Sequence, residues 1–231
     1  MFRFITIVLM GVCGAANALP IDLSNAVYNT STFAEVGADA DSLHTDSSPP
    51  TPLPLFSHAE IFGADISVNE FATAEAIADD GFLSVATEVQ SSLQYAGVVA
   101  EASLEAELAD AGRYLLQLDF ENMLDLIGAQ AGTVLGLVLS VGSRTWFDEI
   151  FTDSVLISRL FVLAPGELGL LHLSLSSTAD SFADGTREVL YAFNLASVNV
   201  ALATSVPSPS PFALLGAALV PIVRLRRAHR G

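Results

Sequence analysis

Residues 98–108 read VVAEASLEAEL, and apolar and polar side chains alternate along this stretch with a period of two. The even positions are all apolar, whereas the odd positions from Glu101 onward carry glutamate or serine. Such alternation is typical of an antiparallel strand with one buried and one wet face. Alanine, glutamate and leucine also favour helices, but the unbroken alternation predicts a strand.

Further strands are predicted where apolar runs or alternation are bounded by turn residues. They cover 70–77, 82–91, 114–120, 133–141, 154–163, 168–176 and 187–203. Asp79-Asp80-Gly81 predicts a hairpin between the first two, and Pro165-Gly166 predicts a hairpin between 154–163 and 168–176. In the last strand Val189, Tyr191, Phe193 and Leu195 share one face.

Seven to nine short strands without long amphipathic helices predict an all-β fold, a jelly-roll-like β-sandwich over 59–205. Residues 19–58 are predicted to be an irregular linker or surface loop, because they are polar and contain the run SSPPTPLP at 47–54. A first strand within 23–28 is left open.

The first 18 residues have the features of a signal peptide helix. Arg3 precedes an apolar run at 4–12, and Ala16-Asn17-Ala18 predicts cleavage between Ala18 and Leu19 by signal peptidase. The alternative, an uncleaved membrane anchor, is disfavoured because spanning a bilayer takes about 20 apolar residues. The only cysteine, Cys13, lies in this segment, so the mature chain is predicted to lack disulfides.

Charge restricts the partners of residues 19–205, the body of the chain. Residues 19–205 contain 26 acidic residues against four arginines, an excess of 22 negative charges, and the chain has no lysine. Such a field repels nucleic acid. It leaves a weak possibility of Ca²⁺ binding near Asp39, Asp41 and Asp46, although these residues do not follow the EF-hand pattern. No other metal or cofactor site is predicted.

The sequence contains no G-x-S-x-G, H-E-x-x-H or G-x-x-x-x-G-K-[ST] motif. His172 falls on the polar side of its predicted strand, and Glu101, Glu105 and Glu107 are interpreted as a solvated face. No catalytic residue is therefore predicted, and the protein is not expected to be an enzyme.

The chain ends VPSPSPFALLGAALVPIVRLRRAHRG, residues 206–231. As a helix, the apolar run at 212–223 is about 18 Å long, short of a hydrocarbon core of about 30 Å. It predicts a marginal membrane helix. A basic cluster follows that the positive-inside rule keeps in the cytoplasm. That cluster consists of Arg224, Arg226, Arg227 and Arg230.

This order of elements resembles the PEP-CTERM sorting signal, a proline motif followed by an apolar helix and an arginine cluster. The proline motif is a variant, Val206-Pro207-Ser208-Pro209, in which Ser208 stands where the family usually has glutamate. The resemblance covers about the last 26 residues. It implies export in a Gram-negative bacterium, transient anchoring in the inner membrane, processing by an exosortase-like enzyme and association with exopolysaccharide. The alternative is a plain C-terminal anchor.

Together these features predict an exported, non-enzymatic protein of the cell surface or extracellular matrix. Two alternatives stay open. One is a secreted carbohydrate- or calcium-binding module, and the other is a secreted hydrolase without a recognisable motif.

Overall fold

The computed structural model describes residues 18–23, 25–47, 53–63, 70–182 and 189–205. The predicted signal helix and the C-terminal membrane helix lie outside the described residues. The described secondary structure consists of β-strands. They are β1 (Ala18–Pro20), β2 (Val27–Val36), β3 (Asp39–Ser47), β4 (Leu55–Phe62), β5 (Phe71–Asp79), β6 (Phe82–Ser91), β7 (Ala96–Leu108), β8 (Gly112–Ile127), β9 (Gln130–Val141), β10 (Arg144–Phe151), β11 (Val155–Leu163), β12 (Gly169–Ser181) and β13 (Leu190–Ser205).

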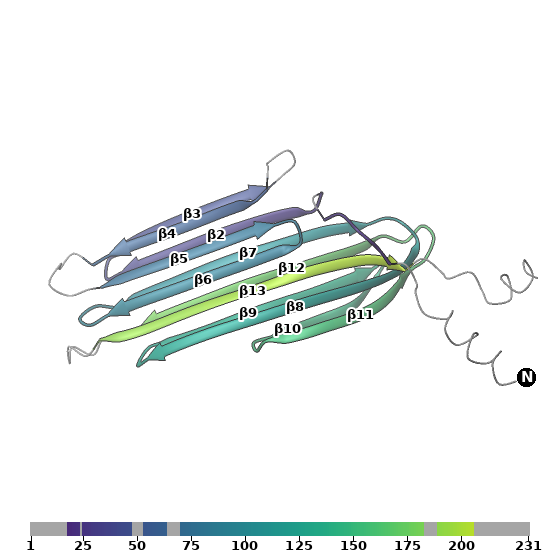
Figure 1. Ribbon diagram of the computed structural model, residues 1–231. Coiled ribbons are helices and arrows are strands. Elements are labelled where there is room, and N and C mark those ends of the chain that lie inside the picture. Colours follow the sequence, from purple (N-terminus) through teal and green to yellow (C-terminus); the bar gives the residue numbers. More distant parts are fainter. Residues whose placement is uncertain (1–17, 24, 48–52, 64–69, 183–188, 206–231) are drawn as a thin grey trace, which may run out of the picture.

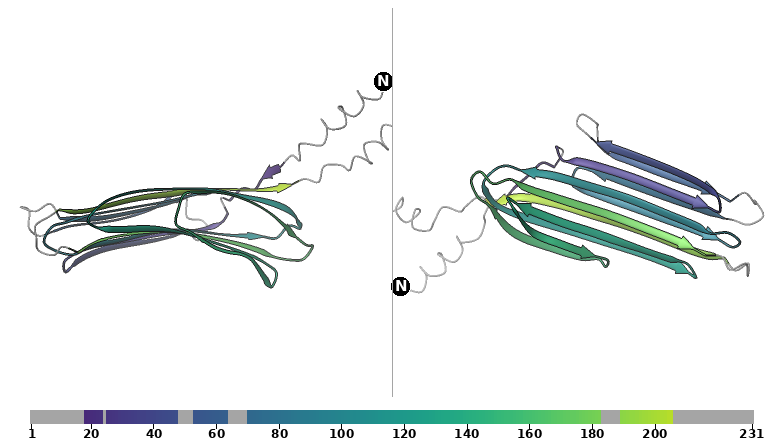
Figure 2. Two further views of the ribbon diagram at one scale, coloured as in Figure 1. Left: turned by 90° about the horizontal axis from the view of Figure 1, so that it is seen from below. Right: turned by 180° about the vertical axis from the view of Figure 1, so that it is seen from behind.

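The strands form two antiparallel sheets packed face to face (Figures 1 and 2). The seven-stranded sheet has the order β11-β8-β13-β6-β5-β4, and β1 pairs with the end of β13. The six-stranded sheet has the order β10-β9-β12-β7-β2-β3. The predicted all-β sandwich is confirmed, and the stretch quoted first forms most of β7.

The pairing of the last eight strands is nested. β6 pairs with β13, β7 with β12, β8 with β11, and β9 with β10, and successive pairs alternate between the two sheets. A long antiparallel ribbon folded over itself in this way is a jelly roll. The strands β2 to β5 extend both sheets on one side, so the body is wider than an eight-stranded jelly roll.

The prediction of an irregular segment over 19–58 is wrong for most of its length. This region supplies β1, β2, β3 and the beginning of β4. On β2 the inward positions Tyr28, Thr30, Thr32 and Ala34 are buried, but two are threonines and the alternation is weak by hydropathy. β3, DADSLHTDS, is an edge strand, and an edge needs little apolar surface.

One predicted hairpin is confirmed and the other is wrong. β5 and β6 pair across Asp79-Asp80-Gly81, and Gly81 has the positive φ, 67°, that favours glycine there. By contrast, β11 pairs with β8 in one sheet, whereas β12 pairs with β7 and β9 in the other. The Pro165-Gly166 turn therefore crosses between the sheets.

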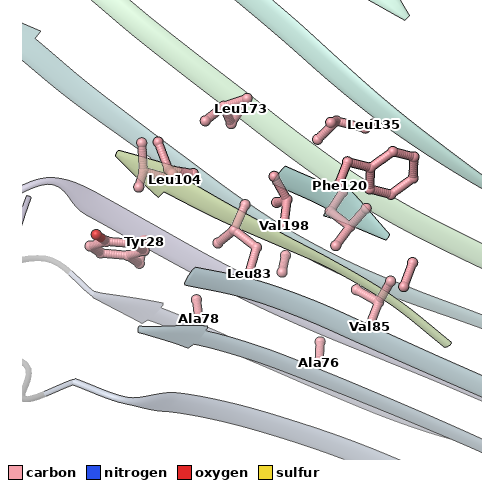
Figure 3. Packing of buried hydrophobic residues seen from close by; sticks show 14 of the residues in the cluster. Tyr28, Ala76, Ala78, Leu83, Val85, Leu104, Phe120, Leu135, Leu173 and Val198 are labelled. Atoms are coloured by element: carbon pink, nitrogen blue, oxygen red, sulfur yellow. The ribbon is translucent and has the colours of Figure 1, made fainter. Parts of the chain in front are cut away.

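The core changes character across the sandwich (Figure 3). On β5 the inward side chains are Ala72, Ala74, Ala76 and Ala78, all fully buried. Cα atoms of β5 and of the facing β2 come within 8 Å, closer than the usual 10 Å or so between packed sheets. On β8, β9 and β12 the core is instead built largely from leucine, with Phe120 on β8. Small side chains therefore let the two sheets approach closely between β2 and β5.

Hydrogen bonds between buried side chains join the two sheets through this core. Each satisfies a polar group that would be costly to bury alone. They are Thr30–Ser57 at 2.7 Å, Thr87–Ser177 at 2.8 Å, Ser91–Ser181 at 2.6 Å, and Asn194 Nδ2 to Thr133 Oγ1 at 2.6 Å.

Candidate binding surface

A shallow polar trough of about 500 Å³ crosses the outer face of the six-stranded sheet. Its outward-facing lining comes from three neighbouring strands. β12 supplies His172, Ser174 and Ser176; β7 supplies Glu101 and Ser103; and β2 supplies Asn29 and Ser31. Because side chains alternate along a strand, these positions all project from the same face.

The register explains why the face is hollow here. Ser174 lies opposite Ser103 on β7 and opposite Gly136 on β9, so three small residues form a row across the strands. A Cβ atom at Gly136 would lie only 2.7 Å from Ser174 Oγ, so glycine keeps this row low. The adjoining row contains His172, which lines the trough, and Glu105 opposite it on β7, both with longer side chains.

Polar contacts link side chains in and beside the trough. His172 Nδ1 lies 3.7 Å from Glu105 Oε2, and Ser31 Oγ donates to Glu101 Oε2 at 3.2 Å. His172 and Glu105 are 41% and 50% exposed, so their pairing contributes little to stability. The trough therefore presents hydroxyl, carboxylate and imidazole groups that remain accessible to a ligand.

The sequence located part of this surface. His172 lies on the outer face of β12, as predicted, and Glu101, Glu105 and Glu107 lie exposed on the outer face of β7. Asn29 and Ser31 were missed because they fall in the segment predicted to be irregular. Their alternation with the buried Tyr28, Thr30 and Thr32 was the available signal.

Aromatic side chains gather on the opposite outer face, that of the seven-stranded sheet. The register places Phe62, Phe71, Gln90 and Tyr191 in one row across four strands. Phe193 belongs to the adjoining row. The face shared by Tyr191, Phe193 and Leu195 is thus the outer one, while Ala192, Asn194 and Ala196 are buried. Burial and the neighbouring Glu88 carboxylate raise the pKa of Tyr191.

The acidic residues considered for Ca²⁺ do not converge within the described part of the chain. No group of three or more His, Cys, Asp or Glu side chains suited to a metal ion occurs among the described residues. Asp41 instead accepts hydrogen bonds from the backbone amides of Ser42 at 2.9 Å and Glu60 at 3.3 Å. The Asp46 side chain lies outside the described residues.

Most residues of the predicted sorting signals also lie outside the described residues. They are Ala16, Val206, Pro207, Ser208, Pro209, Arg224, Arg226, Arg227 and Arg230. The backbone of the predicted cleavage site is described: Ala18 pairs with Ser205 and Leu19 with Thr204. The two ends of the body therefore meet at one end of the sandwich (Figure 2). Over the described ranges, no helix is long and apolar enough to cross a membrane.

No protein-family model and no curated protein matches the chain. Among solved structures, TmCBM61 in complex with beta-1,4-galactotriose is similar at 10% identity over 53% of this chain and 81% of that chain, with a TM-score of 0.25. A structure of carbohydrate-binding modules from the beta-sandwich superfamily is similar at 8% identity over 80% and 86% of the two chains, with a TM-score of 0.21. A GH31 alpha-xylosidase from Xanthomonas citri is similar at 11% identity over 84% of this chain and 19% of the enzyme, with a TM-score of 0.22. TM-scores this low establish neither a shared topology nor a shared function.

Proposed function

We propose that this protein is an exported, non-enzymatic surface or matrix protein that binds neutral polysaccharide in the trough of the six-stranded sheet. The observation that carries the binding role is the trough itself. Its floor of Ser103 and Ser174 leaves room for a ligand, and Glu101 and Asn29 beside it offer acceptors and donors. Sugar hydroxyls are both donors and acceptors, so such a lining matches a polyhydroxylated chain.

Charge narrows the class of polysaccharide. The body has 22 more negative than positive charges, and Glu101, Glu105 and Glu107 lie on the same face as the trough. A polymer of uronic acids or sulfated sugars would meet like charge at this surface. The proposed ligand is therefore a polysaccharide without acidic groups.

Blocking the trough tests the proposal. Ser174→Trp places a large side chain on the floor, and we expect it to reduce retention on a neutral glucan column at least tenfold. Thr178→Trp is the matched control, because Thr178 projects from the same face of β12 one row beyond Ser176 and outside the trough lining. A polygalacturonate column should retain neither the wild-type protein nor the variants.

Four outcomes contradict parts of this proposal. Equal loss in both tryptophan variants, or none in either, rejects the trough. Binding that survives Ser174→Trp but is lost in Tyr191→Ala places the ligand on the aromatic face instead. Binding that requires Ca²⁺ favours a calcium-dependent module. Hydrolysis of the glucan by the purified protein, abolished by Glu101→Gln, would favour the hydrolase alternative.

The export route is proposed from the two ends of the chain. The pairing of Ala18 with Ser205 supports it, because a body whose ends meet at one point can be attached to a membrane through either segment without unfolding. Intact-mass measurement of the exported protein is expected to show a start at Leu19 and loss of the arginine cluster. A membrane-bound protein that retains Arg224–Arg230 would instead identify a plain anchor.

A further inference from the structure

The two sheets end in four edge strands, and three of them carry features that oppose pairing with another chain. β3 contains Asp39, Asp41 and Asp46. β4 carries Glu60, whose backbone amide donates to Asp41 Oδ2 of β3. β10 carries Asp148 and Glu149 and has a register shift between Thr145 and Phe147. Charges and bulges of this kind are how natural sheets protect their edges.

The fourth edge strand, β11, has less of this protection, since its one charged residue, Arg159, is paired at 3.8 Å with Glu149 of β10 in the same chain. Its sequence, VLISRLFVL, contains no acidic residue and no proline, and it pairs with β8 in an uninterrupted register over nine residues. Three large aliphatic side chains project from its outer face: Leu156 is 76% exposed, Leu160 71% and Val162 51%. An edge strand that is straight, apolar and uncharged on its outer face is a template for β-pairing.

Charge favours this edge as the place where two copies meet. The acidic body repels a second copy over most of its surface. Three of its four arginines, however, lie on strands of this side: Arg113 on β8 and Arg159 on β11 of the seven-stranded sheet, and Arg144 on β10, the edge of the other sheet. These arginines offset part of the acidic charge on this side, Arg159 through its ion pair with Glu149.

We propose that two copies of this chain associate by antiparallel pairing of β11 with β11, which joins their seven-stranded sheets into one. A two-fold axis at Ser158 places Leu156 opposite Leu160 of the second copy and Ser158 opposite its own equivalent. An axis at Arg159 would instead place two arginines directly opposite each other, which is unfavourable. The axis at Ser158 avoids that clash.

The pairing would bury an apolar cluster on the outer face. Leu160 already lies opposite Leu115 of β8 within one copy, so the cluster continues across the strand. Aliphatic side chains that are now exposed would gain burial worth about 25 cal/mol per Å². This association is independent of polysaccharide binding, because β11 and the trough belong to different sheets.

A disulfide test addresses the predicted register. Opposed residues of antiparallel strands have Cα atoms about 4.5–5.5 Å apart, within the range a disulfide spans. The experiment uses the full chain with Cys13 replaced by serine, so that an engineered cysteine is the only thiol. On mild oxidation, Ser158→Cys is expected to give a covalent dimer on a non-reducing gel. Ser42→Cys, on the exposed edge strand β3, is the matched control and should stay monomeric.

A second variant separates pairing from random collision. Leu160→Glu in the Ser158→Cys background should lower dimer yield at least tenfold, whereas Phe62→Glu, at a 64% exposed position of edge strand β4, should leave it unchanged. Leu160 is largely exposed, so its replacement does not disturb the core. Equal cross-linking through Ser42→Cys and Ser158→Cys, or none through Ser158→Cys, overturns the proposal. A dimer that forms only after deletion of 206–231 also overturns it, since the tail would then be what covers β11.

Discussion

The clearest quantitative test concerns Glu70, which locks the connection between the two sheets. Glu70 is 3% exposed, and its Oε1 accepts hydrogen bonds from three successive backbone amides. These are Ser92 at 3.2 Å, Leu93 at 2.6 Å and Gln94 at 3.0 Å. Its Oε2 accepts from Gln94 Nε2 at 3.2 Å. Residues 92–94 join β6 of one sheet to β7 of the other, so one carboxylate fixes the crossover.

The expected cost follows from which amides can reach water when the carboxylate is removed. Ser92 is buried, whereas Leu93 is 42% exposed and Gln94 is partly exposed. An unsatisfied buried donor costs about 1–3 kcal/mol, and bonds to a charged acceptor are worth more than neutral ones. Glu70→Ala should therefore destabilise the fold by about 2–4 kcal/mol. Glu70→Gln keeps an acceptor oxygen and should cost about half as much.

The assay is urea unfolding of residues 19–205, the segment that contains both sheets apart from the first residue of β1. Glu75→Ala is the matched control. Glu75 lies on β5, five residues further along the chain, but its side chain is 48% exposed and its only described ion pair is with His58, so the change should cost about 0.5 kcal/mol or less. A Glu70→Ala protein within 0.5 kcal/mol of wild type, or no less stable than Glu75→Ala, would refute the reasoning.

Three further predictions concern the core. Ala76→Leu should destabilise the fold by about 1–3 kcal/mol, because the larger side chain overpacks the core where β2 and β5 are close. Leu137→Ala should destabilise it by about 2–5 kcal/mol, because it leaves a cavity. If Ala76→Leu raised stability in thermal unfolding, the close approach of the sheets would be contradicted. In a double-mutant cycle, Thr87→Val and Ser177→Ala should each destabilise the fold by about 1–2 kcal/mol, and the double variant should lose less than the sum of the two. Strict additivity would mean that the two hydroxyls are not coupled. Burial raises the pKa of Tyr28 from 10.0 to about 12, so between these pH values the unfolded state binds fewer protons and stability should fall by about 3 kcal/mol. Tyr28→Phe should remove this loss of stability at high pH. If the pH profile of stability stayed unchanged in Tyr28→Phe, the loss would not come from Tyr28.

The strands that could be predicted are those whose alternation is strong and whose turns are local. Residues 98–108 have one apolar and one acidic face, and they form β7 with that orientation. The β5–β6 hairpin was predictable because Asp79-Asp80-Gly81 joins two neighbours in both sequence and space. The exposed glutamates and His172 of the trough followed from the same alternation. In these cases the burial pattern of a strand is set by its own residues.

Tertiary structure decided which strands pair and which faces are buried. The 154–163 and 168–176 strands flank a strong turn, yet they belong to different sheets because β8 and β7 provide their partners from distant sequence. Tyr191 and Phe193 are more apolar than Asn194, but Asn194 is the buried residue, and its Nδ2 donates to Thr133 of the opposite sheet. The same holds for Asn29 and Ser31, which reach the trough only because β2 pairs with β7. Alternation within the individual strands, with turn residues between them, predicted a β-sandwich, whereas hydrogen bonds and packing between distant strands decided where the candidate binding surface and the exposed edge lie.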